Sequence, residues 1–222
     1  MSYFITGTDT GVGKTLVSCA LLHAFVAQGK RAVGLKPVAA GCDKAGQNDD
    51  ARSLLAAGNV QAAYDQINPY CFEQPIAPHL AARQAGGSIE FPRILSSYRL
   101  LAGQADEVVV EGVGGFCVPL NDKQDSADLA RQLELPVILV VGMRLGCLNH
   151  ALLTLRAIDD YQLECAGWVA NVLDAGMPAL QENIAALRER IAAPLLGIIP
   201  YQAQLDAHAV ATNLNVGLLG KR

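Results

Sequence analysis

The most constraining feature of the sequence is a glycine-rich loop between a short apolar strand and an apolar helix. Tyr3–Thr6 is typical of a short buried strand, and Leu16–Gln28 has the apolar content of a helix that Gly29 closes. The loop between them reads Gly7-Thr8-Asp9-Thr10-Gly11-Val12-Gly13-Lys14-Thr15. Such a loop points successive backbone N–H groups at one spot, where the helix N-terminus adds partial positive charge. The unit therefore predicts a cradle for phosphate groups.

The last residues of the loop indicate which phosphates the cradle holds. Lys14 can reach the β- and γ-phosphates of a nucleoside triphosphate, and the Thr15 hydroxyl can ligate Mg²⁺. Five residues separate Gly7 from Gly13 where the usual motif has four, so the loop is a variant P-loop. A plain glycine turn before a helix is the alternative, but the strand–loop–helix context favours triphosphate binding.

Short runs rich in Val and Ile alternate with helical patterns along the rest of the chain. We expect further strands at Ala32–Leu35, Glu107–Val110, Pro136–Gly142, Ala166–Asn171 and Leu195–Ile199. We expect helices at Ile89–Ala102, Ser126–Leu133, Leu148–Tyr161 and Pro178–Ile191, with a short one around His79–Gln84 in an otherwise irregular stretch from Val60 to Gly87. Strands that are apolar on both faces belong to buried parallel sheets. The alternation predicts a single doubly wound α/β domain over residues 1–222, with a mostly parallel β-sheet flanked by helices as in P-loop NTPases.

Composition and charge exclude several other classes of protein. Hydrophobic residues make up 51% of the chain and charged residues only 17%, which is typical of a compact globular protein. A net charge of −4 without any Lys/Arg run argues against a nucleic-acid partner. The near-continuous apolar run Leu135–Met143 is far shorter than the roughly 18 residues that span a bilayer. With no export signal before the first strand, we expect a cytoplasmic protein without a membrane partner.

The cysteines show no metal-binding or redox spacing. No C-x-x-C pair occurs among the six, and in a cytosolic protein of this size free buried thiols are expected. The six are Cys19, Cys42, Cys71, Cys117, Cys147 and Cys165.

We expect the chemistry in the loops after the predicted strands, because ligands of such sheets bind outside the carboxyl ends of the strands. Lys36 ends the second strand, and the loop stiffened by Pro37 can hold its ammonium facing the P-loop. A solvated surface lysine is the alternative. Asp49 and Asp50 open a helix, where one acid can act as a cap and the other can face Mg²⁺. Capping alone explains this pair equally well.

An acidic residue ends a later apolar strand. Glu111 follows Val108–Val110 in the way that a second metal-side carboxylate follows a strand in P-loop proteins. The glycines in Gly112–Gly115 let backbone approach a ligand closely, although they do not form a dinucleotide-binding motif. A purely structural Glu111 is the alternative.

The loop Met143–His150 leads into a helix whose N-terminus could hold a carboxylate or a phosphate. On pattern alone, Asn149 and His150 are better explained as capping residues. The sequence shows no Ser/His/Asp or Cys/His arrangement, and its four histidines are dispersed.

Taken together, these loops closely resemble the dethiobiotin synthetase family, the ATP-dependent carboxylases that close the ureido ring in biotin biosynthesis. The matches run in family order from about residue 3 to Pro200. The matching segments are Thr6–Thr10 with Gly13–Thr15, Lys36–Ala39, Asn48–Ala51, Asn68–Tyr70, Val110–Gly115, Leu145–His150 and Gly167–Asn171.

The resemblance implies the ligands of each loop. The residues that would surround Mg²⁺ are Thr15, Asp50 and Glu111. The residues that would bind ATP, with Asn171 recognising adenine, are Gly11, Val12, Gly13, Lys14, Thr15, Leu16, Asp50, Glu111, Gly112, Val113, Gly114, Asn171, Val172, Pro200, Tyr201 and Gln202.

The resemblance also implies how the substrate is held. Lys36, Lys14 and Thr10 would be the catalytic residues, and Lys36 would meet the carbamate and the transferring phosphoryl group. The residues that would contact the substrate are Thr10, Lys36, Ala40, Gly146, Cys147, Leu148 and Asn149. In this family the last four bind the distal carboxylate across a homodimer interface.

The implied reaction suits these residues. One amine of 7,8-diaminononanoate reacts with CO₂ to give a carbamate, whose oxygen attacks the γ-phosphorus of ATP. The second amine then closes the ring of the carbamic–phosphoric anhydride and expels phosphate. Such a transfer needs alignment and charge neutralisation, not a protein nucleophile.

Two positions depart from the family pattern. Many members have serine where this chain has Ala40, and some have an acid where it has Gly11. Neither change touches Lys14 or the metal-side residues. After Pro200 the similarity fades, and Asp206 is only a candidate ribose contact.

Two other functional classes share the P-loop. A nucleotide-driven switch of the septum- or chromosome-positioning type has a signature lysine in the loop, where this chain has Asp9, and no C-terminal amphipathic membrane helix is evident here. A small-molecule kinase, or the synthetase half of a glutamine-dependent cobyrinate amidating enzyme, is the second alternative. The latter needs a glutaminase domain, for which 222 residues leave no room.

Overall fold

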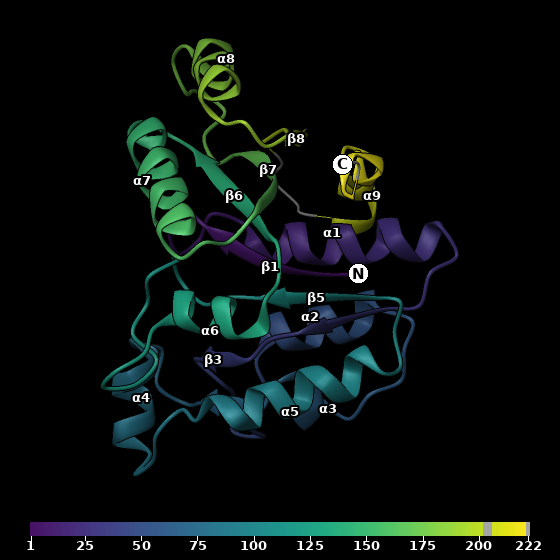
Figure 1. Ribbon diagram of the computed structural model, residues 1–222, viewed down its shortest axis with the longest axis vertical. Coiled ribbons are helices and arrows are strands. Elements are labelled where there is room, and N and C mark those ends of the chain that lie inside the picture. The colour runs from purple at the N-terminus through teal and green to yellow at the C-terminus, as the bar shows by residue number, and fades with distance from the viewer. Residues whose placement is uncertain (202–205, 221–222) are drawn as a thin grey trace.

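A six-stranded parallel sheet forms the centre of the computed structural model, which describes residues 1–201 and 206–220. Figure 1 shows its strands between two layers of helices. The strand order is β2-β5-β1-β6-β7-β8. The strands are β1 (Ser2–Gly7), β2 (Ala32–Leu35), β5 (Glu107–Glu111), β6 (Val137–Met143), β7 (Cys165–Val172) and β8 (Leu195–Ile199).

Helices cover both faces of the sheet, as a doubly wound fold requires. On one face lie α1 (Lys14–Ala27), α2 (Asp49–Ala57) and α9 (Ala207–Ala211), followed by the short 3₁₀ helix η1 (Val216–Leu218). On the other lie α5 (Phe91–Ala102), α6 (Ser126–Leu133), α7 (Cys147–Asp160) and α8 (Leu180–Arg190). The predicted fold class is confirmed.

Alternation of side chains along the strands produces this two-faced core. Tyr3 and Ile5 of β1 pack toward α1, whereas Phe4 between them packs toward the opposite layer. Strand β6 is buried along its whole length, as expected for a central strand of a parallel sheet. Because all six strands run parallel, their carboxyl ends meet at one edge, and the glycine-rich loop after β1 lies there.

The predicted boundaries differ from the observed ones by at most two residues, and local geometry explains the larger shifts. Helix α8 begins at Leu180 rather than at Pro178, because Ala179 has a left-handed backbone with φ of 52°. Helix α5 begins at Phe91 rather than at Ile89, with a proline in its first turn, a position that proline favours.

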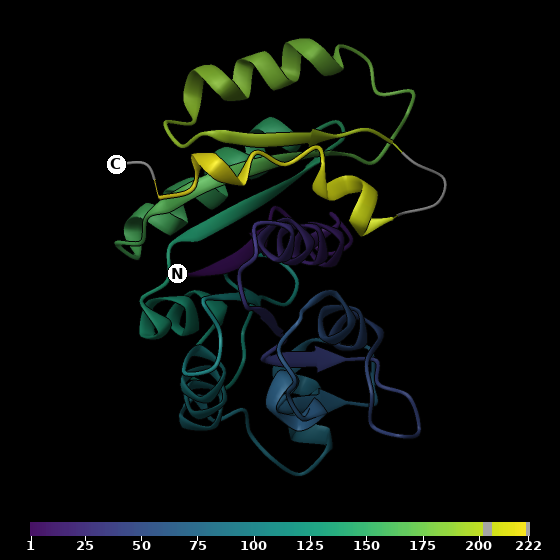
Figure 2. The ribbon, with the colours of Figure 1, turned by 90° about the vertical axis from the view of Figure 1, so that its right-hand side faces the viewer.

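The stretch that the sequence left irregular contains regular structure. Strands β3 (Val38–Ala40) and β4 (Tyr70–Phe72) form a separate two-stranded parallel sheet. Near it lie α3 (Tyr64–Ile67) and α4 (Pro78–Gln84). Figure 2 shows this region below the main sheet, on the side away from α8. Strands of three residues are too short to show a periodicity in sequence, so they were not predicted.

The expectation of six free thiols is wrong for two of them. Cys42 and Cys71 form a disulfide, with Cα atoms 6.0 Å apart. Cys42 lies just after β3 and Cys71 lies within β4, so the pairing of these two unpredicted strands brings the sulfurs together. The remaining four cysteines are free.

None of the helices in residues 1–201 and 206–220 combines the length and the apolar character needed to cross a membrane.

Candidate functional site

The glycine-rich loop curls over the carboxyl end of β1 and continues directly into α1. Gly13 has a φ of 91° and caps the helix without a side chain. A Cβ at this position would lie 2.2 Å from Nδ2 of Asn171, so only glycine fits between the loop and β7. Asn171 in turn donates a hydrogen bond from Nδ2 to the Val12 carbonyl, at 2.9 Å. The loop is therefore tied to the end of β7.

Lys14 lies in the first turn of α1 and is buried, with 7% exposure. Its Nζ donates to the Asp9 carbonyl at 3.0 Å. Burial, followed by the like charge of Lys36, lowers the pKa of Lys14 to about 8. The charged form of Lys14 is thus disfavoured unless an anion lies beside it.

Four oxygen- and nitrogen-bearing side chains meet next to the loop. The Thr15 hydroxyl donates to Oε1 of Glu111 at 2.8 Å. Nζ of Lys36 lies 2.6 Å from the same oxygen and 3.2 Å from Oδ2 of Asp50. These residues come from α1, β5, the end of β2 and α2, so the convergence of strand ends predicted from the sequence is observed.

Lys36 is held as a buried cation between two acids. Its side chain is 5% exposed, and that of Glu111 is 1% exposed. Burial alone lowers the pKa of Lys36, but the charges of Glu111 and Asp50 outweigh it and raise the pKa above its usual value. Nζ also donates to the Gly112 carbonyl at 3.3 Å. Neither the solvated lysine nor the purely capping acid pair describes this geometry.

The backbone of the Lys36 segment is fixed from behind. Asn68, which is buried, donates from Nδ2 to the Lys36 carbonyl at 2.7 Å. The N-cap of α2 is Asn48, whose side chain accepts from the backbone N–H of Asp50 and Ala51. Because Asn48 rather than Asp49 or Asp50 caps this helix, the carboxylate of Asp50 is free to face Lys36.

One oxygen in the cluster is left without a hydrogen-bonding partner. Oε2 of Glu111 is buried and accepts no hydrogen bond. Carboxylate and hydroxyl oxygens are the ligands that Mg²⁺ prefers, and Mg²⁺ usually completes its shell with substrate phosphates. Within the described residues, no group of three or more His, Cys, Asp or Glu side chains is arranged to hold a metal ion alone. The donors Thr15, Asp50 and Glu111 therefore suit a cation that phosphate oxygens would share.

These groups open into a cavity of about 690 Å³. The charged residues Lys14, Lys36, Asp50 and Glu111 line it together with Thr10 and Thr15. Besides Asn48 and three glycines, apolar side chains form the rest of the lining, and we call six of them the apolar wall. The apolar wall consists of Ala39, Ala40, Pro75, Ile76, Ala77 and Pro78.

The structure brings most, but not all, of the predicted residues to this cavity. Thr10, Gly11, Gly13, Leu16, Val113 and Gly114 line it as well. Gly112 is buried behind it, and Val172 is buried at the end of β7. Pro200 and Tyr201 are exposed after β8, outside the cavity lining. Gln202 lies outside the described residues, and Asp206 caps α9 by accepting from the His208 N–H.

The N-terminus of α7, from its cap Gly146 to Asn149, does not line the cavity of its own chain. Gly146 and Asn149 are exposed, Leu148 is half-buried, and Cys147 is buried with 1% exposure. Neither Asn149 nor His150 caps the helix, because the N-cap is Gly146 without a side-chain bond.

An ion pair that the sequence did not indicate links the short loop between β6 and α7 to the P-loop. Arg144 pairs with Asp9, whose other oxygen accepts the Thr10 N–H at 2.7 Å. The backbone bond from Thr10, with smaller contributions from Arg144 and His150, lowers the pKa of Asp9. The apolar wall was also missed, since the contact between residues 39–40 and 75–78 depends on the unpredicted sheet.

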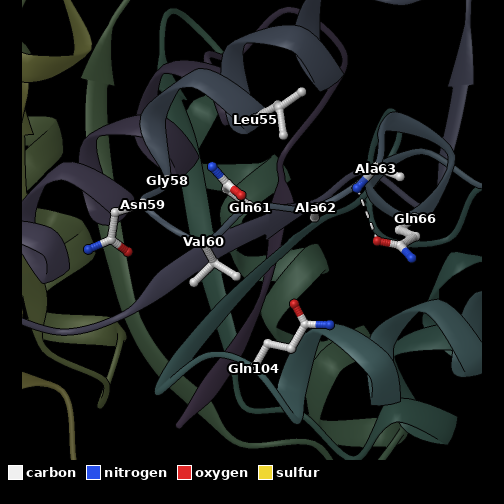
Figure 3. A pocket seen from close by; sticks show the side chains of 9 residues that line it. All are labelled: Leu55, Gly58, Asn59, Val60, Gln61, Ala62, Ala63, Gln66 and Gln104. Atoms are coloured by element: carbon white, nitrogen blue, oxygen red, sulfur yellow. Dashed lines mark hydrogen bonds between the residues drawn. The ribbon is translucent and has the colours of Figure 1, made fainter.

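A second depression shows that volume alone does not identify a site. It measures about 780 Å³ and lies near the amino end of β2, lined by amides and small apolar side chains without any charge (Figure 3). Two of its amides serve the fold. Asn59 accepts from the Ala32 N–H at 2.8 Å, and Gln66 accepts from the Ala63 N–H at 3.0 Å.

Comparisons with known proteins show which family the chain resembles along its whole length. Residues 1–209 match the family model of an AAA domain. The chain is 53% identical over 218 residues to an ATP-dependent dethiobiotin synthetase of Nitrosospira multiformis, covering 98% of this chain and 96% of the relative. It is 53% identical to that of Aromatoleum aromaticum, with 97% of both chains covered, and 50% identical to that of Cellvibrio japonicus, with 97% and 96% covered.

Solved structures with the same fold are more distant. The MinD cell division protein of Aquifex aeolicus superposes with a TM-score of 0.54 at 16% identity, covering 96% of this chain and 86% of that one. The cell division protein FtsY of Thermotoga maritima gives 0.51 at 17% identity, with 97% and 68% covered. At this identity the likeness concerns the P-loop fold alone.

Proposed function

We propose the function of this protein from one premise, which is that the chain belongs to the family of ATP-dependent dethiobiotin synthetases. The protein is accordingly a ligase of biotin biosynthesis that uses ATP to form dethiobiotin. The observation that carries the proposal in structural terms is the buried Lys36 ammonium, 2.6 Å from Glu111 and 3.2 Å from Asp50, beside the P-loop.

The substrates we assign are 7,8-diaminononanoate, CO₂ and ATP. A carbamate formed on one amine attacks the γ-phosphorus, ADP leaves, and the second amine attacks the carbamic–phosphoric carbonyl as phosphate departs. Carbamate and triphosphate are both anions, so bringing them together needs fixed positive charge. Lys14 and Lys36 line the same cavity and supply it. Thr10, at the cavity mouth, is our candidate contact for the diamine.

We assign Mg²⁺ to Thr15, Asp50 and Glu111, with phosphate oxygens completing the shell. The partnerless Oε2 of Glu111 supports the assignment, because a buried carboxylate oxygen is costly unless something pairs with it. When bound, the ion would neutralise charge on the β- and γ-phosphates. Lys36, which already contacts the same carboxylate, would keep its ammonium directed at the reacting oxygens.

We assign the adenine end to the edge beyond Gly13. The backbone of Gly11 to Leu16, with the glycines of Gly112–Gly114 nearby, would hold the phosphates. Asn171 touches this loop, and Pro200 and Tyr201 follow the neighbouring strand β8, so the base would lie between them. Val172 and Gln202 are assigned here on the family resemblance alone.

We propose that two chains complete the substrate site as a homodimer. The segment Gly146–Asn149 does not line the cavity of its own chain, yet the family pattern assigns the distal carboxylate of the substrate to it. Leu145, beside it, is 97% exposed, and Leu153 on α7 is 53% exposed. Exposed large apolar side chains suit burial against a partner.

We further propose that residues 1–222 act as one domain and that the enzyme works in the cytoplasm, where ATP is supplied. Ala40 replaces the serine of many relatives, so a hydroxyl contact to the diamine is replaced by backbone or water.

One assay tests the proposal. The purified protein is mixed with ATP, Mg²⁺, bicarbonate and the diamine, and both phosphate and dethiobiotin are measured. We expect phosphate release that depends on bicarbonate and on the diamine, with one dethiobiotin per phosphate. ATP hydrolysis that is indifferent to the diamine would contradict the synthetase and favour a nucleotide-driven switch.

A further inference from the structure

The disulfide between Cys42 and Cys71 joins the two segments that form the apolar wall. Cys42 comes two residues after Ala40, and Cys71 comes four residues before Pro75. The two segments also touch directly, since a Cβ at Gly41 would lie 3.3 Å from Cβ of Pro75. The bond therefore fixes the separation of the two halves of the wall.

The same bond is connected to the charged side of the cavity. Sγ of Cys71 lies 4.0 Å from the Tyr64 hydroxyl, which accepts the Asn48 N–H at 2.7 Å. Asn48 caps α2 by accepting the Asp50 N–H at 3.0 Å. A shift of the β4 segment would thus displace the N-terminus of α2, where Asp50 contacts Lys36.

The thiols are placed for exchange with a small molecule. Cys71 is partly exposed and lines a pocket of about 540 Å³ that also contains Arg93 and Tyr70. Cys42 is more buried, with 8% exposure. In a cytoplasmic enzyme most thiols are kept reduced, and the disulfides that do form are usually transient or redox-sensing.

We propose that Cys42 and Cys71 form a reversible redox-modification site that sets the affinity of the cavity for the diamine. The inference rests on the proposed function for the identity of that substrate. The disulfide-bonded pair is the state in which Lys36, Asp50 and Glu111 are seen in contact. We assign the higher affinity to the oxidised protein, because the disulfide fixes the separation of the two halves of the apolar wall.

The oxidant is a low-molecular-weight disulfide, and the exchange balances. The Cys71 thiolate attacks one sulfur of the reagent, forming a mixed disulfide and expelling one thiolate. The Cys42 thiolate then attacks the Cys71 sulfur and expels the second. The two protons lost by the cysteines end on the two released thiols, so the protein loses two hydrogens and the reagent gains them.

Reduction is expected to loosen the wall without unfolding the small sheet. The backbone N–H groups of Gly41 and Cys42 both donate to the Phe72 carbonyl, at 2.9 and 3.0 Å, and these bonds do not depend on the sulfurs. We expect the diamine KM to rise roughly three- to tenfold on reduction, since the wall positions the substrate. The ATP KM should change less than the diamine KM, because Asp50, and no residue of the P-loop, is linked to this bond.

The experiment compares the wild-type enzyme equilibrated in reduced and in oxidised glutathione. Free thiols are counted by alkylation and mass spectrometry, and the KM values for diamine and ATP are measured in each buffer. We expect four free thiols and the lower diamine KM after oxidation, and six free thiols and the higher KM after reduction. Six free thiols in both buffers, or a diamine KM that does not change with the number of free thiols, would overturn the proposal.

Serine variants give the matched control. Cys42→Ser and Cys71→Ser should show the higher diamine KM in both buffers, whereas Cys117→Ser, which removes an exposed free thiol, should respond like the wild type. A response retained in Cys42→Ser would also refute the assignment. Absence of dethiobiotin in either buffer would instead be a failure of the proposed function, and the two failures are thereby distinguishable.

Discussion

At each end of strand β5 a buried glutamate pairs with a lysine from another segment, but the surroundings of the two pairs differ. Glu107 begins the strand and Glu111 ends it, and both are buried, with 3% and 1% exposure. Each accepts from a lysine at nearly the same distance: 2.5 Å from Lys30 and 2.6 Å from Lys36. A buried Lys–Glu pair is therefore not enough to identify a functional site.

Exposure and the neighbouring cavity distinguish the two ends. Neither Oε2 accepts a hydrogen bond, although that of Glu107 lies 3.4 Å from the Met1 amino group. The side chain of Lys30 is 40% exposed, but that of Lys36 is only 5% exposed. At the amino end the charge of Glu107 is neutralised by Lys30 and by the Met1 amino group, both of which are exposed to water. At the carboxyl end Lys36 and Glu111 line a cavity together with Lys14 and Asp50, which is the property that marks it as a site.

The largest effect expected at the carboxyl end comes from Lys36→Ala. Product formation should fall on the order of 10³-fold, because the charge that meets the anionic reacting groups is lost. Nucleotide affinity should stay within a fewfold of the wild type, since Lys36 lies outside the P-loop. Dethiobiotin formation and ATP binding by calorimetry measure the two separately, with Lys30→Ala as the matched control at the other end. If Lys36→Ala bound no nucleotide, the role given to Lys36 would be wrong.

Glu111→Gln is expected to come next. The amide keeps the shape and can accept from Thr15, but it removes the charge that Lys36 and the metal share, so kcat/KM should fall roughly 10²-fold. The loss should be partly offset by raising the Mg²⁺ concentration. Steady-state rates across a Mg²⁺ series measure this, and a variant as active as the wild type at every concentration would contradict the assignment.

Glu107→Gln should lower stability while leaving activity almost unchanged, the opposite of what is expected for Glu111→Gln. The buried carboxylate pairs with Lys30 and the Met1 amino group, so its loss should lower the free energy of unfolding by about 1–3 kcal/mol. Product formation should remain within about twofold of the wild type, because the cavity lies at the other end of the sheet. Urea unfolding and the dethiobiotin assay provide the two values. Loss of activity at full stability would refute the contrast.

The smallest effect is expected at an exposed pair beside Glu107. A side-chain hydrogen bond from Arg31 is the largest contribution that lowers the pKa of Asp106 to about 2, from an ordinary value of 3.8. Because the folded value is the lower one, the stabilisation is present above pH 3.8 and is lost as the pH falls toward 2. Arg31→Ala should raise the pKa of Asp106 and reduce the loss of stability between pH 3.8 and pH 2. Carboxyl NMR titration reads the pKa, and an unchanged value would contradict the cause.

The sequence predicted those parts of the molecule that depend on local pattern. The strands at Ala32–Leu35 and Leu195–Ile199 and the helix at Ser126–Leu133 have the predicted bounds, because their apolar patterns stop at clear boundaries. Lys36 and Glu111 could be placed together before any coordinates, since parallel strands bring their carboxyl ends to one edge.

The parts that were missed depend on contacts between distant segments. The pairing of β3 with β4 joins stretches about thirty residues apart, and with it come the disulfide and the apolar wall. The Arg144–Asp9 pair likewise spans two loops that no motif relates. Predicting such contacts requires the three-dimensional arrangement, because the sequence pattern of neither segment indicates which other segment it contacts.

Binding of Mn²⁺, a paramagnetic substitute for Mg²⁺, tests most directly whether the carboxyl end of β5 is the metal and nucleotide site. Bound Mn²⁺ is counted by electron paramagnetic resonance in the presence of ADP for the wild type, Glu111→Gln and Glu107→Gln. We predict one Mn²⁺ per chain in the wild type and in Glu107→Gln, and affinity weakened about tenfold or more in Glu111→Gln. Equal Mn²⁺ affinity in all three proteins would contradict the account.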